Sequence, residues 1–220
     1  MAFFEWLKQS GPAGLESMGH KFEQMLEDGR HVFDLAANGL LAGGDPEVFR
    51  EDLFSTDRRI NRTEIEIRRQ LVVHGSVTGA QHLPELLVMM SLVKDAERIG
   101  DYAKNLYDLA AQGDLLPASE KPALIEAKDE ISRLLVRGRN IYSENNQPGA
   151  VEFLKDAGEL EDRCDASVAR LLKVGGENMA AAVLTYRYFK RVASHASNIV
   201  TSLVVSVDQL DYFDEPKPGQ

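Results

Sequence analysis

One helical segment of the chain reads Lys94-Asp95-Ala96-Glu97-Arg98-Ile99-Gly100-Asp101-Tyr102-Ala103-Lys104-Asn105-Leu106. Apolar residues recur along it at alternating steps of four and three, which places them on one face of a helix; they are Leu92, Ala96, Ile99, Ala103, Leu106 and Ala110. Glu97, Asp101 and Asn105 recur at steps of four and share a second face. Because that face continues upstream with apolar side chains, we predict that it is not simply exposed to solvent; these are Val93, Met90 and Leu86.

The two acids of this segment lie one helical turn apart, so their charges repel each other. A bound cation offsets such repulsion, because carboxylate and amide oxygens are ligands for hard and borderline metal ions. The alternative is that Glu97 and Asp101 form ordinary ion pairs on the helix surface. Basic residues that could form such pairs lie nearby in the sequence: Lys94, Arg98 and Lys104. Asn105 is either a third metal ligand or a hydrogen-bond partner of a neighbouring helix.

The segment has a second copy in the chain. From Lys190 the sequence reads Lys-Arg-Val-Ala-Ser-His-Ala-Ser-Asn-Ile. Laid under Glu97 to Leu106, it matches at three positions, which are Arg98 with Arg191, Ala103 with Ala196, and Asn105 with Asn198. This spacing indicates an internal repeat of roughly 90 to 100 residues. Glu97 becomes Lys190 and Asp101 becomes Ser194, so the second copy keeps packing positions and loses both acids.

The nine residues from Glu97 to Asn105 resemble the signature of the PhoU family, in which an acidic pattern of this spacing ends in Asn on the third helix of a three-helix repeat. The resemblance implies an all-α, up-and-down bundle of two tandem three-helix repeats. It also implies a cytoplasmic regulator of phosphate uptake and phosphate signalling, whose partner is a phosphate transporter subunit or a sensor kinase, and a homodimer. Finally, it implies that divalent or iron-type metal ions bind through these motifs.

Glycine and proline clusters divide the chain into six expected helices over residues 15–41, 46–74, 80–111, 121–144, 150–173 and 177–210. In the last of these, we read residues 203–205 as buried helix rather than strand. The expected organisation is an N-terminal cap or arm over residues 1–14, a first repeat over 15–113, a linker over 114–122, a second repeat over 123–211 and a flexible tail over 212–220.

Further candidate ligands lie on the neighbouring helices. Asp57 and Asn61 are four residues apart on the second helix, so antiparallel packing would bring them toward Glu97 and Asp101. We therefore predict a metal site of Glu97, Asp101, Asp57 and Asn105. The second half offers Glu161 and Asp165 opposite Lys190 and Ser194, and we predict that Lys190 acts there as a built-in counter-charge. His195 is either a rescuing metal ligand or a hydrogen-bonded packing residue.

Composition limits the other classes of function. A formal net charge of −10 over 220 residues argues against nucleic acid as a partner. The single cysteine suits a reduced cytosolic setting, and no apolar run is long enough for membrane insertion. Neither a phosphate-binding glycine loop nor a nucleophile elbow occurs, so we predict that the chain is not an enzyme.

Three alternatives stay open beside the PhoU-like regulator. One is a helical interaction scaffold that binds no metal. Another is an accessory protein of a sodium- or proton-coupled phosphate transporter. The third is a metal-dependent oxidoreductase, against which the absence of any Glu-x-x-His sequence counts.

Overall fold

The computed structural model of the chain describes residues 13–175 and 179–210, apart from the side chains of 13–16, 80 and 81. The expected N-terminal cap or arm lies outside the described residues up to residue 12, and the expected tail over 212–220 lies outside them altogether. The described part is all-α and contains no strand, which confirms the predicted fold class. Its long helices are α2 (Ala13–Ala42), α3 (Glu47–Thr78), α4 (Leu83–Ala110), α5 (Lys121–Glu144), α6 (Gln147–Val174) and α7 (Met179–Thr201). Two short 3₁₀ helices are η1 (Gly79–His82) and η2 (Val207–Gln209).

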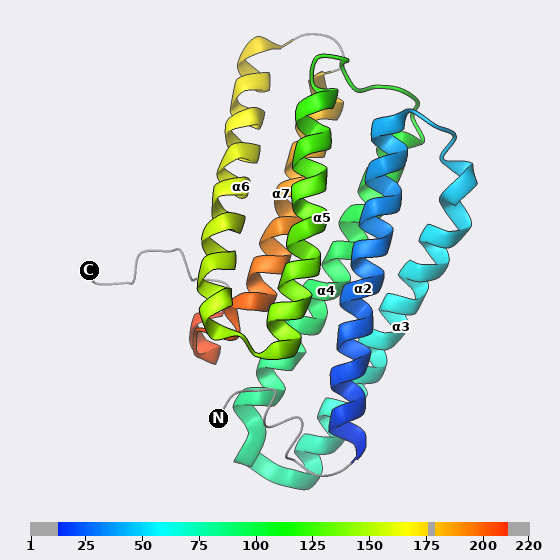
Figure 1. Cartoon of the computed structure of the whole chain (residues 1–220). Coiled ribbons are helices and arrows are strands. Elements are labelled where there is room, and N and C mark those ends of the chain that lie inside the picture. The colour runs from blue at the N-terminus through cyan, green and yellow to red at the C-terminus, as the bar shows by residue number, and fades with distance from the viewer. Residues whose placement is uncertain (1–12, 176–178, 211–220) are drawn as a thin grey trace.

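The long helices run along roughly one axis and alternate in direction, as an up-and-down bundle requires (Figure 1). Helices α2, α3 and α4 pack on one another, and α5, α6 and α7 form a second group of the same kind. The two groups meet along α2 against α5 and along α4 against α7. The helix that carries the quoted segment therefore lies at the centre, between its own repeat and the helix that carries the second copy.

The predicted apolar stripes form the core. The stripe residues of α4 are almost fully buried; they are Leu92, Ala96, Ile99, Ala103, Leu106 and Ala110. Aromatic pairs join the two groups: Phe33 meets Phe189 edge to face at a centroid distance of 5.6 Å, and Phe22 meets Tyr142 at 5.1 Å. Such pairs stabilise the packing by about 0.5–1.5 kcal/mol beyond their buried area. The two halves thus share one core rather than two separate ones.

Helix ends follow the breaker residues. Asn145 stops α5 in the left-handed conformation at φ 52°, and Asn146 then caps α6 by accepting a hydrogen bond from the Gly149 backbone N–H at 3.0 Å. Asparagine suits both roles, because it tolerates positive φ and its side chain mimics a backbone acceptor. Gly79 ends α3 at φ 68°. These ends set the register in which α3 and α4 face each other.

The expected helix ends are wrong in two places. The gap between the expected helices over 46–74 and 80–111 is still helix as far as Thr78, and within it Ser76 Oγ donates to Val72 O at 2.8 Å and Thr78 Oγ1 to His74 O at 2.9 Å. Hydroxyl groups bonded to the carbonyl one turn back fit inside a helix, so the chain breaks only at Gly79. As a result, α4 begins at Leu83, after a 3₁₀ turn, rather than at Ala80.

The second error concerns residues 203–205, which lie after α7 and not within it. The N–H groups of Leu203 and Val204 bond the carbonyls three residues back, at 3.0 and 2.9 Å, so the helix tightens and stops. Ser202 Oγ also bonds Ile199 O at 2.6 Å and competes for the backbone of the last turn. Leu203 nevertheless remains buried, so its burial was predicted correctly while its helical backbone was not.

Candidate functional site

The acids singled out in the sequence gather where α3 packs against α4. Asp57 on α3 and Glu97 on α4 are both buried, at 7% and 8% exposure, although they are charged. Close helix approach makes this possible. A Cβ atom on Gly100 would lie 3.3 Å from Ile60 Cδ1 and 3.7 Å from Asp57 Oδ1, so glycine is the residue that lets α3 approach here. The face of Glu97 is therefore an interhelical face, as the apolar residues upstream of it predicted.

One lysine ammonium bridges the two helices in this cluster. Lys104 Nζ lies 3.0 Å from Asp57 Oδ1 and 2.9 Å from Asp101 Oδ1. Asp101 also accepts from Arg98 at 3.1 Å, and Glu97 accepts from Lys94 at 2.5 Å. Each of the three carboxylates thus contacts at least one side-chain cation. The pairs that the surface alternative expected, with Lys94, Arg98 and Lys104, are therefore present, but Glu97 is buried between helices rather than exposed on the helix surface.

Burial and ion pairing shift the pKa values of these groups in different directions. Desolvation raises the pKa of Glu97, and the hydrogen bond from Lys94 offsets this only in part. Desolvation acts on Asp101 too, but the hydrogen bond and charge of Lys104 leave its pKa below the ordinary value. Desolvation acts to lower the pKa of Lys104, but its bonds to Asp101 and Asp57 raise that pKa on balance. Lys104 is therefore charged at neutral pH.

The remaining predicted ligands take different places. Asn61 joins the cluster by donating to Asp57 Oδ2 at 3.3 Å. Asn105 is half-buried one turn beyond Asp101, and within the described part of the chain no hydrogen bond links it to the acids. Glu64, which the sequence did not single out, is buried nearby and raises the pKa of Glu97 through its charge. Glu64 lies two helical turns after Asp57 on α3 and so shares its face, which the sequence could have shown.

Carboxylate oxygens suit a hard metal ion, but their present arrangement does not fit one well. The bridging position between Asp57 and Asp101 is occupied by the ammonium of Lys104. Among the residues that the structure describes, no group of three or more His, Cys, Asp or Glu side chains is placed to hold a metal ion. Metal binding at Glu97, Asp101, Asp57 and Asn105 stays a prediction.

The second repeat confirms the predicted counter-charge. Lys190 on α7 contacts Asp165 on α6, and Arg187 Nη1 approaches the same carboxylate at 3.0 Å. The hydrogen bond from Lys190 lowers the pKa of Asp165. Ser194 Oγ, which stands where the first copy has Asp101, donates to Glu161 at 2.5 Å. Glu161 and Asp165 of α6 therefore meet their expected partners on α7.

His195 takes the hydrogen-bonded role. Its Nδ1 lies 2.8 Å from Asp95 Oδ1, and Asn198 Nδ2 donates to the same oxygen at 3.0 Å. Tyr102 stacks on the His195 ring at a centroid distance of 5.7 Å. Asp95 is 7% exposed and was missed in the sequence. Its signal was position: it lies three residues after Leu92 and four before Ile99, which is within the buried stripe of α4.

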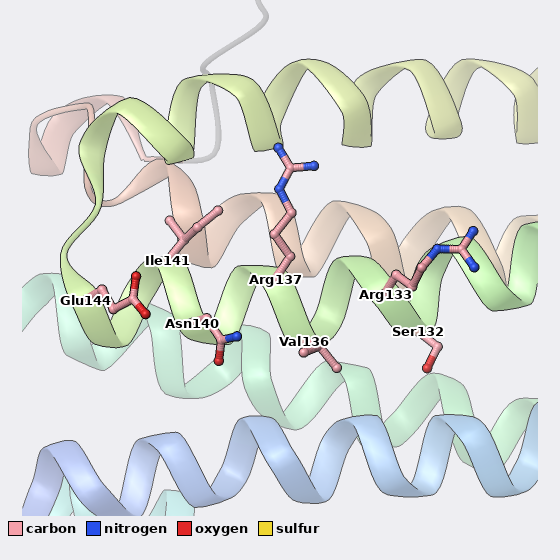
Figure 2. Close-up of a pocket in the computed structure, with 7 residues that line it drawn as sticks. All are labelled: Ser132, Arg133, Val136, Arg137, Asn140, Ile141 and Glu144. Carbon is pink, nitrogen blue, oxygen red and sulfur yellow. The ribbon is translucent and has the colours of Figure 1, made fainter.

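Two hollows on the surface lie apart from these clusters. One, of about 360 Å³, follows α5 alone. Figure 2 shows Arg133 and Arg137 leaving this helix on one side while Ser132, Val136 and Asn140 leave on the other, so its polar groups do not converge. The other, of about 440 Å³, lies among α5, α6 and α7 beside Cys164. In the second hollow, Arg163 of the lining is already hydrogen-bonded to Glu130 at 2.5 Å.

Comparison with known proteins places the chain. Residues 15–110 match the family model described as the PhoU domain. The chain is also 30% identical over 158 residues to the phosphate-specific transport system accessory protein PhoU homolog of Synechocystis. The chain thus carries a PhoU domain over residues 15–110. The Synechocystis match spans 65% of this chain and 66% of that relative, just under two thirds of the relative's length.

Solved PhoU structures share the fold. The crystal structure of PhoU from Pseudomonas aeruginosa superposes with a TM-score of 0.74 at 18% identity, covering 87% of this chain and 96% of that one. The PhoU phosphate transport system regulatory protein of Streptococcus pneumoniae gives a TM-score of 0.67 at 19% identity, covering 86% and 94%. At these identities the likeness establishes the PhoU fold. Of the helices that the structure describes, none is long and apolar enough to cross a membrane.

Proposed function

We propose that this chain regulates inorganic phosphate uptake and phosphate signalling by binding a phosphate transporter subunit or a sensor kinase. The observation that carries the proposal is the PhoU domain match over residues 15–110, which contains the quoted segment. The Synechocystis relative, which is named as a transport system accessory protein, supports the same role. A regulator of this kind acts by contact, so it needs a surface rather than a reaction centre.

A candidate contact surface lies at one end of the bundle, where α3 ends and α4 begins (Figure 1). Large aliphatic side chains are exposed on these last and first turns, and we call them the end patch: Val72, Val73, Val77, Leu83 and Leu87. The two helix ends lie close together, since the ring centroids of His74 and His82 are 6.2 Å apart. Val77 is 81% exposed. Contiguous exposed apolar groups are typical of protein contact sites, and we propose that the partner protein binds here.

The test is genetic and uses the full chain. In the source organism, deletion of the gene is expected to raise phosphate uptake and phosphate-starvation gene expression in phosphate-replete medium. The parent gene restores repression, whereas a Val73→Asp/Val77→Asp variant that folds normally does not. Val48→Asp is the matched control, because Val48 is 85% exposed at the opposite end of α3 and is expected to restore repression. Uptake and expression that are unchanged by the deletion would contradict the proposed function.

The metal-free scaffold is the second candidate, and one observation favours it. The predicted ligands Asp57, Glu97 and Asp101 are all ion-paired with lysine or arginine side chains. A regulator that acts as a docking surface alone does not require metal. Binding of a divalent or iron-type metal, a cytoplasmic location and a homodimer stay predictions from the resemblance and composition.

A further inference from the structure

The position expected for a metal in the first repeat is held by Lys104. Its Nζ lies between two helices, 3.0 Å from Asp57 Oδ1 on α3 and 2.9 Å from Asp101 Oδ1 on α4. The Lys104 side chain is 26% exposed, so water screens this bridge less than it screens a surface pair. A single ammonium thus joins the two helices, which is the role that a bridging metal ion would have.

A metal ion and this ammonium cannot use the same oxygens together. Divalent ions bind carboxylate oxygens at about 2.0–2.6 Å, which is closer than the hydrogen bonds of Lys104. A metal ion on both Oδ1 atoms would therefore lie beside Nζ and repel it. Metal entry requires Lys104 to give up both of its bonds and to move its charge away.

The charges of the cluster balance without a metal ion. The carboxylates of Asp57, Glu97 and Asp101 are matched by three side-chain cations, Lys94, Arg98 and Lys104, and nearby Glu64 pairs with Arg68 at 2.9 Å. Metal sites rich in carboxylates depend on a negative charge that the protein leaves uncompensated. Here each acid already has the electrostatic partner that a metal would supply.

In the second repeat, too, a lysine contacts an acid on the neighbouring helix, but this lysine stands at a different position of the repeat. Lys190 aligns with Glu97, and it contacts Asp165 on the neighbouring helix α6. Glu161, the other acid of that helix, is hydrogen-bonded by Ser194 at 2.5 Å and by Ser197 at 3.3 Å. A lysine that contacts an acid on the neighbouring helix therefore occurs independently in both halves.

We propose that Lys104 is a built-in counter-cation that takes the place which a bridging metal ion would have in the first repeat. The ammonium holds α3 against α4, so the chain folds and keeps this register without a bound metal. The acids remain a latent divalent-cation site that opens only when the positive charge of Lys104 is removed.

The experiment compares the full-length parent with Lys104→Met, which keeps the length of the side chain and loses its charge. Lys21→Met is the matched control, because Lys21 Nζ also joins two helices, at 2.8 Å from Glu66 Oε2. Each purified protein is stripped with chelator and checked by circular dichroism. Mn²⁺ affinity is then measured by titration calorimetry, and thermal unfolding midpoints are measured in EDTA and in MnCl₂. Lys104→Gln replaces Lys104→Met if the latter does not fold.

The parent and Lys21→Met are expected to unfold at the same midpoint in EDTA and in MnCl₂. Lys104→Met is expected to bind Mn²⁺ at least about tenfold more tightly than either, with a midpoint that rises in MnCl₂. Adding Asp57→Asn is expected to abolish this gain. A parent midpoint that rises in MnCl₂, or a Lys104 variant that binds Mn²⁺ no more tightly than the parent, overturns the proposal. The parent measurement alone suffices for this if neither Lys104 variant folds.

Discussion

His195→Ala is expected to destabilise the bundle by about 2–4.5 kcal/mol. His195 Nδ1 donates to Asp95 Oδ1 at 2.8 Å, and the side chains are 18% and 10% exposed. A hydrogen bond to a charged group at such a site contributes about 1.5–3 kcal/mol. Stacking on Tyr102 adds about 0.5–1.5 kcal/mol. Asp95 keeps its bond from Asn198 in the variant, so the larger penalty of a fully unpaired buried charge does not arise.

The assay is urea unfolding at neutral pH, with free energies obtained by linear extrapolation. His31→Ala is the matched control, because His31 makes the same kind of pair with Asp52 at 3.0 Å while the two side chains are 44% and 55% exposed. We expect a loss below about 1 kcal/mol there. The pairing energy itself comes from a double-mutant cycle of His195→Ala with Asp95→Ala. Equal losses of unfolding free energy for His195→Ala and His31→Ala would refute the reasoning, because burial of the pair between the repeats would then add nothing to its stabilising effect.

Three further outcomes follow from single contacts. Burial raises the pKa of the Cys164 thiol to about 12, so we expect the folded chain to react with a thiol reagent at pH 8 far more slowly than the urea-unfolded chain. Hydrogen bonds from Arg170 hold the pKa of Glu120 below its ordinary value of about 4.5, so this pair stabilises the fold above that pH and the contribution is lost on acidification below it. Unfolding of Glu120→Gln is accordingly expected to depend less on pH between 3 and 6, roughly the range of carboxyl titration. Gly39→Ala would place a Cβ atom 2.3 Å from the Phe49 ring, and its unfolding in urea is expected to show a loss of roughly 1 kcal/mol or more from overpacking.

The fold was predictable because its signals are local. Apolar residues at helical spacing fixed the buried face of α4, and breaker residues such as Asn145 and Gly175 marked the helix ends. The failures lay at helix ends where serine and threonine hydroxyls bond the backbone. Ser76 and Thr78 bond carbonyls one turn back and lie inside α3, whereas Ser202 bonds Ile199 O just beyond the end of α7. The same residue type occurs in both settings, so residue type alone could not locate these ends.

The candidate site was predictable only in part, because its chemistry depends on which side chains meet between helices. The four-residue spacing brought Asp57 toward Asp101, but it did not reveal that Lys104 would reach both. The sequence shows Asp95 among the apolar positions of α4, but its partners His195 and Asn198 are about a hundred residues away in the chain. A contact at that separation depends on the packing of α4 against α7, which periodicity within one helix does not determine.

The two repeats together show why an acidic motif does not by itself specify a metal. Helix packing brings carboxylates from neighbouring helices together, and their repulsion must be offset by some cation. In the first repeat the cation is Lys104, which follows Asp101 by three residues, and in the second it is Lys190, which aligns with Glu97 itself. Two different sequence changes thus reach one electrostatic result. The spacing of the acids fixes where a cation is needed, and the neighbouring lysines decide whether the protein supplies it from its own chain.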